Sequence, residues 1–127
     1  MTLDIDTEKR AELTREVFRV LAAWKVPSGA YPALLGLPAD TRTRVLNRYR
    51  MGTPLPAETE VYQRMALVME IDSALHKLFP HSPASGDLWI TTPRARFGGV
   101  TPLDIMLERG VPGMQRLVDV LNNQEGL

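Results

Sequence analysis

Cysteine is absent from this sequence of 127 residues. Its absence excludes thiol catalysis, cysteine-based zinc sites and a disulfide framework, and it fits a reducing compartment. No apolar run reaches the ~18 residues that a membrane span requires. Basic and acidic residues number 15 each, so no excess charge indicates nucleic acid or a membrane as the partner. The N-terminal segment MTLDIDTEKR is acidic and polar, unlike a signal peptide. We expect a cytoplasmic protein.

Histidine is scarce as well, and the patterns of catalytic sites are missing. His76 and His81 are the two histidines, and neither has a metal-ligand spacing such as HExxH. Glu58 and Glu60 are two positions apart, so on a helix they face different ways and form a poor acid/base pair. The FGGVTP segment lacks the spaced glycines and the lysine of a phosphate-binding loop. We therefore expect no catalytic residue, no cofactor and no metal site.

What the sequence does contain is helical periodicity interrupted by clear stops. Apolar residues recur at three- and four-residue spacing, and no stretch alternates with period two for long enough to indicate a sheet. The predicted fold class is all-α, and a proline- and glycine-rich linker over residues 80–86 divides the chain into residues 1–80 and 81–127. Helices are predicted over 7–25, over a short segment that ends at Gly36, over 39–49, over 57–79, as a turn around 87–92, from Thr101 to Gly110, and up to residue 123.

Arginine supplies twelve of the fifteen basic residues, and several of these cluster over residues 41–50 with no acid among them. Because LLGLPAD precedes it, this segment resembles a helix-turn-helix with a short helix, a glycine turn and a recognition helix. The alternative is a solvated basic helix that binds nothing. The candidate DNA-binding residues are Arg42, Thr43, Arg44 and Arg48.

The most elaborate stretch is TTPRARFGGVTPLDIMLERG. Its glycine pair, Gly98 and Gly99, predicts a turn with positive φ. The TPLD segment that begins at Thr101 predicts a helix cap, with proline at the first helical position and an acid at the third. The nearby Arg94 and Arg96 are expected either to be solvated or to bind an acidic partner.

The segment LWITTPRARFGGVTPLDIMLERGVPGMQRLVDVLNN resembles the toxin-binding domain of the Xre/MbcA/ParS antitoxin family. That pattern has a tryptophan or apolar turn, a TPN…LGG.TPLDLL core and a following G…V…L helix. Here Trp89, Phe97 and the glycine pair stand in the expected places, with Arg94 where asparagine is usual. Upstream, LLGLPADTRTRVLNRYRMGTPLPAETEVYQRMALVMEI resembles the Xre-like part of the same family, a helix-turn-helix that leads into a long linking helix.

The resemblance implies an antitoxin of a type II toxin–antitoxin pair that binds a RES-type toxin, which consumes NAD⁺ or ADP-ribosylates a target. The implied architecture is an Xre-like helix-turn-helix bundle with a long linking helix and a small C-terminal helical toxin-binding domain. Operator DNA is a possible second partner, and the expected assembly is a homodimer or a toxin–antitoxin hetero-oligomer. Two alternatives stay open: a helix-turn-helix transcriptional regulator without a toxin partner, and an orphan scaffold. The expected toxin-binding residues are Trp89, Arg94, Arg96, Phe97, Gly98, Gly99, Glu125, Gly126 and Leu127.

If the basic segment binds DNA, replacing Arg42, Arg44 and Arg48 by alanine should weaken binding and flatten its salt dependence. Each lost phosphate contact removes about one unit from the slope of log affinity against log salt concentration. Fluorescence anisotropy with labelled DNA across a salt series measures both quantities. Unchanged affinity and slope would remove this segment from DNA recognition.

Overall fold

The chain is described here by a computed structural model, which covers residues 2–124 and the side chains of residues 7–124. Within those residues every regular element is helical, which confirms the predicted all-α class, and no helix is both long and apolar enough to cross a membrane. The elements in order are α1 (Thr2–Ala23), η1 (Ser28–Ala30), α2 (Tyr31–Leu35), α3 (Thr43–Arg50), α4 (Thr59–Leu78), α5 (Pro83–Trp89), η2 (Ala95–Phe97) and α6 (Pro102–Asn123).

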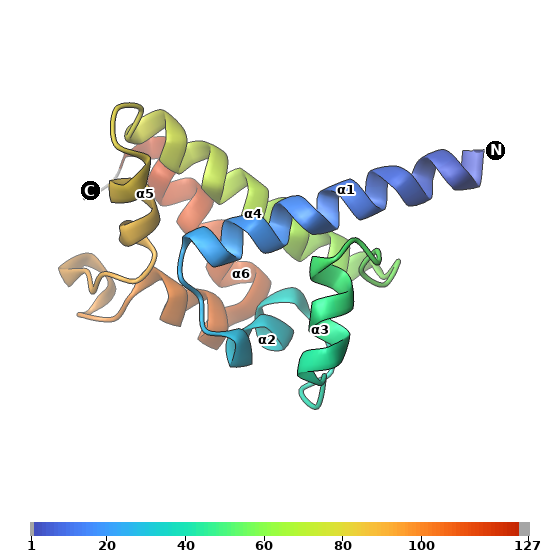
Figure 1. Ribbon diagram of the computed structural model, residues 1–127. Coiled ribbons are helices and arrows are strands. Elements are labelled where there is room, and N and C mark those ends of the chain that lie inside the picture. Colours follow the sequence, from blue (N-terminus) through green and yellow to red (C-terminus); the bar gives the residue numbers. More distant parts are fainter. Residues whose placement is uncertain (1, 125–127) are drawn as a thin grey trace.

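Helix α4 is the centre of the arrangement, since α1, α2, α5 and α6 all pack against it (Figure 1). The N-terminal turns of α1 extend beyond the other helices, and the loop between α5 and α6 forms the opposite edge of the molecule (Figure 1). One continuous hydrophobic cluster fills the interior. Its members with no exposed surface include Val17 and Leu21 of α1, Leu34 and Leu35 of α2, Met65, Val68 and Ile71 of α4, Ile90 just after α5, and Met106, Met114 and Leu117 of α6.

The sequence located the main interruptions of these helices correctly. Gly36 ends α2 in the left-handed conformation, with φ of 74°. Gly110 interrupts α6 with φ of 63° and ψ of −138°, so the predicted break separates two helical limbs, residues 102–109 and 111–123. A residue with a Cβ rarely adopts such a φ, which explains why glycine stands at this kink.

Three predicted boundaries are wrong. Helix α1 begins at Thr2, five residues before the predicted start. Helix α3 begins at Thr43 and not at residue 39, because Thr41 closes a preceding turn through its hydroxyl and its N–H, both bonded to the Pro38 carbonyl at 2.6 and 3.0 Å. Arg42 is therefore the extended residue before the helix. The linker over residues 80–86 is also shorter than predicted, since α5 begins at Pro83: proline fits the first turn of a helix, where its missing N–H costs nothing.

The hydrophobic cluster continues across the predicted division between residues 80 and 81. Leu75 of α4, Trp89 of α5 and Leu117 of α6 belong to it together. The division into two regions, residues 1–80 and 81–127, stays a prediction. The helices on its two sides share one core.

Arg64 of α4 links three elements. Its Nη1 donates to the carbonyl oxygens of Ala33 and Leu34 at 3.0 and 3.3 Å, at the end of α2, and its Nε lies 3.3 Å from a carboxylate oxygen of Glu60. Its Nη2 lies against the kink in α6, because a Cβ built on Gly110 would be 3.1 Å from it. The side chain is only 13% exposed. A cation at the end of a helix satisfies carbonyls that have no partner inside the helix.

Replacing Arg64 by alanine should lower the free energy of unfolding by about 2 kcal/mol, since the carbonyls of α2 lose hydrogen bonds from a charged donor. Urea denaturation followed by circular dichroism measures this loss. The matched control is Arg19→Ala, which breaks an exposed ion pair with Glu16 of 2.7 Å and should cost less than about 1 kcal/mol. Equal losses in the two variants would contradict the role assigned to Arg64.

Asp72 is the charged residue of α4 that faces the interior, with 9% of its surface exposed. Burial raises the pKa of its carboxyl group above the ordinary range, while His76, Arg19 and other neighbouring charges modify the shift. The His76 ring nitrogen Nδ1 lies 3.5 Å from the carboxylate. Because the folded state favours the protonated form, the stability contributed by this group is present at low pH and is lost as the pH rises through its folded pKa.

The Asp72→Asn variant should therefore be more stable than the wild type at neutral pH. Its advantage should shrink as the pH falls and disappear below the ordinary aspartate pKa of about 4, where the wild-type carboxyl is protonated in both states. Thermal unfolding of both proteins over this pH range measures the difference. A stability difference that is constant with pH, or that has the opposite sign at neutral pH, would show that the buried charge is not destabilising.

Candidate partner-binding site

The loop between α5 and α6 has a defined backbone structure. Arg94 organises it: its N–H donates to the Val100 carbonyl at 3.1 Å, and its own carbonyl accepts from the N–H groups of Phe97 and Gly99 at 3.0 and 2.9 Å. Gly98 and Gly99 have φ of 72° and 88°, which confirms the predicted positive-φ turn. We call residues 91–100 the loop ledge, because these bonds hold it in one shape at the edge of the molecule (Figure 1).

Aromatic stacking fixes the loop ledge on the core. The Trp89 and Phe97 rings meet edge to face with centroids 6.3 Å apart, and the Arg94 guanidinium carbon lies 5.4 Å from the Trp89 ring centroid. An arginine over the face of tryptophan gains from cation–π attraction. The Nε atom of Arg94 and the indole Nε1 of Trp89 are buried without a hydrogen-bond partner among the described residues. The stack therefore rests on apolar and cation–π contact.

The first turn of α6 anchors the other end of the ledge. The Thr101 hydroxyl accepts from the Asp104 N–H at 3.0 Å, and the Asp104 carboxylate accepts from the Thr101 N–H at 3.1 Å. These two bonds form a capping box, which confirms the predicted cap. The N–H of Leu103 also donates to the Ile90 carbonyl at 3.0 Å, so the start of α6 is tied to the end of α5.

The predicted toxin-binding residues divide by exposure. Arg96, Gly98 and Gly99 are exposed on the ledge, and Arg94 and Phe97 are half-buried. Trp89 is 2% exposed, so it supports the ledge from beneath and offers no surface of its own. The remaining predicted residues, Glu125, Gly126 and Leu127, lie outside the described residues.

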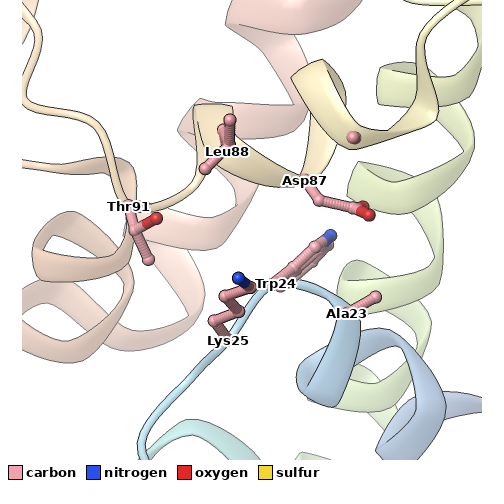
Figure 2. A pocket seen from close by; sticks show the side chains of 7 residues that line it. Ala23, Trp24, Lys25, Asp87, Leu88 and Thr91 are labelled. Atoms are coloured by element: carbon pink, nitrogen blue, oxygen red, sulfur yellow. The ribbon is translucent and has the colours of Figure 1, made fainter.

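A hollow of about 180 Å³ lies where the end of α1 meets α5 (Figure 2). Trp24 forms its wall and is 1% exposed, and its indole nitrogen is turned toward the side chain of Asp87 (Figure 2) without a hydrogen-bond partner among the described residues. Leu88, on the same helix, is 57% exposed. Exposure of Leu88 was not predicted from the sequence, because three apolar residues in succession carry no helical period and its neighbours Trp89 and Ile90 are buried.

The candidate DNA-binding residues lie together on or just before α3. Arg42, Thr43, Arg44 and Arg48 are all exposed, and none of the three arginines forms an ion pair with another described residue. Residues 36–42 connect α2 to α3, a longer connection than the three- or four-residue turn of a typical helix-turn-helix. The predicted residues therefore share one surface. The connection that leads to it is unusually long for a helix-turn-helix.

The fold and the ledge together define a small helical protein that displays a preformed loop beside a capped helix. Residues 74–126 match the family described as the antitoxin Xre/MbcA/ParS C-terminal toxin-binding domain, a region that runs from within α4 through α5, the ledge and α6. The chain belongs to this antitoxin family.

A relative in Sinorhizobium fredii (strain NBRC 101917 / NGR234), the uncharacterized protein y4oB, is 31% identical over 109 residues. The matched segment covers 86% of this chain and 81% of that protein, so the similarity includes the helices before the toxin-binding domain as well. No solved structure matches the chain.

Proposed function

We propose that this chain is a non-enzymatic antitoxin that neutralises a RES-type toxin by direct binding, with residues 81–127 as the part that contacts the toxin. The observation that carries the proposal is the loop ledge, which lies inside the matched toxin-binding region and is held by backbone bonds, a capping box and aromatic stacking. A surface that is already ordered loses little conformational entropy when it binds.

The exposed part of the ledge suits a protein partner. Arginine and aromatic residues are enriched at interface hot spots, and Arg94 and Phe97 are half-exposed beside the fully displayed Arg96. Leu88 adds an exposed apolar side chain one helical turn before the ledge. We place the chain's last residues, including Glu125 and Leu127, nearest the toxin's active site, as the family resemblance implies.

Operator binding by the exposed arginines of α3 is a second proposed activity, favoured by their lack of acidic partners among the described residues. In that case a dimer or a toxin–antitoxin assembly would bring two α3 helices to two half-sites. The competing function is a transcriptional regulator that has no toxin partner, for which the ledge would serve assembly of the regulator.

Affinity capture of the tagged chain from its native host, followed by co-expression with the recovered toxin, tests the proposal. The full chain should restore growth, and a chain that ends at Leu121 should not, because the truncation removes the residues placed nearest the toxin's active site. Far-ultraviolet circular dichroism should show nearly the same helical content in both. The control is a chain of full length in which residues 122–127 are replaced by glycine and serine.

Full protection by the truncated chain would remove the tail from the neutralising contact. Protection by the glycine–serine chain, with none by the truncated chain, would show that length matters and the side chains do not. Recovery of the chain alone, or with DNA only, would favour the regulator.

A further inference from the structure

A second hollow, of about 320 Å³, lies beside the loop ledge and is lined by arginine from three places in the chain. Arg96 comes from η2, Arg109 from the end of the first limb of α6, and Arg116 from the second limb. Phe97 and the buried Ile105 complete its lining, which contains no carboxylate. We call this the arginine hollow.

The kink in α6 brings the two limbs of that helix together beside the hollow. A Cβ built on Gly113 would lie 2.5 Å from the Ile105 carbonyl oxygen and 2.7 Å from the Arg109 Cβ, so the second limb touches the first at this point. Arg116 follows Gly113 by three residues and therefore lies on the same face of its limb. The glycine contact thus places the side chains of Arg109 and Arg116 on one surface.

The charges of Arg109 and Arg116 are not balanced by ion pairs among the described residues. The ion pairs there join Arg19 to Glu16, Arg64 to Glu60 and His76 to Asp72, and neither Arg109 nor Arg116 takes part in one. The acid nearest to Arg116 along its limb is Asp119, whose carboxylate accepts from the Gln115 side chain at 3.1 Å. Like charges held close together repel one another, and a carboxylate relieves this repulsion with charge-assisted, often bidentate hydrogen bonds.

We propose that the arginine hollow receives acidic side chains of the toxin, so that Arg109 and Arg116 are specificity-determining contacts of the complex. This inference rests on the proposed function, since the hollow adjoins the ledge within the matched toxin-binding region. Its apolar floor of Phe97 and Ile105 lowers the local dielectric when a partner covers it, which strengthens the ion pairs. The hollow is at the small end of the range for ligand pockets, about 300 Å³, and suits a few carboxylate side chains.

The test compares the affinity of the full chain for its cognate toxin between wild type and variants, at low and at high salt. Arg109→Ala with Arg116→Ala should weaken binding by at least about tenfold, and Arg109→Glu with Arg116→Glu should weaken it further, because close charge pairs at interfaces couple strongly. The matched control is Lys9→Glu with Arg15→Glu, the same change of charge on exposed residues of α1, which should leave the toxin affinity nearly unchanged. Circular dichroism and thermal unfolding verify that each variant folds, and the alanine pair decides the matter if the glutamate pair does not fold.

Three outcomes would overturn the inference, and they are distinguishable. A wild-type chain that forms no complex with a RES-type toxin overturns the proposed function and this inference with it. A complex that forms normally, with the same affinity and salt dependence in the alanine pair, overturns the inference alone. Titration of the free chain with pyrophosphate is the third: saturable binding that the alanine pair loses, while toxin affinity stays unchanged, would assign the hollow to a small anion.

Discussion

The position of Arg64 is the constraint on which the two candidate surfaces depend. Its guanidinium satisfies carbonyls at the end of α2 and occupies the space beside Gly110. A single side chain of α4 therefore lies against both the turn that leads to α3 and the kink of α6. A side chain larger than hydrogen at Gly110 would displace that guanidinium. Arg64 therefore contacts both the helix that precedes the basic helix and the kink that precedes the limb carrying Arg116.

Arginine serves three different physical purposes in this chain, although the formal net charge is zero. Arg64 is nearly buried and acts as a helix cap, and Arg94 is half-buried on the face of Trp89, where its planar group stacks. Arg109 and Arg116 border a hollow, where their charge is available to a partner. Lysine could not fill the first two roles equally. Its single nitrogen could not reach the α2 carbonyls and Glu60 from separate positions as Nη1 and Nε of Arg64 do, and it has no planar group to lie on a ring.

The local features of this fold were predictable from sequence, whereas the long-range ones were not. The capping box at Thr101, the turn at Gly98 and Gly99, and the kink at Gly110 follow from residue types over a few positions, and the structure confirms them. The start of α5 at Pro83 was missed because proline marks both a break and a helix start. The arginine hollow could not be foreseen, because Arg109 and Arg116 share a surface only through the contact of Gly113 with the first limb of α6, and Arg96 joins them from η2.

These features together favour recognition by local complementarity over long-range attraction. A chain with no net charge exerts little steering force on a distant partner, so its association rate gains little from electrostatics. Specificity then depends on contact: a ledge fixed by backbone bonds presents its shape at low entropic cost, and an adjoining hollow of positive charge rejects any surface that lacks acids at the matching place.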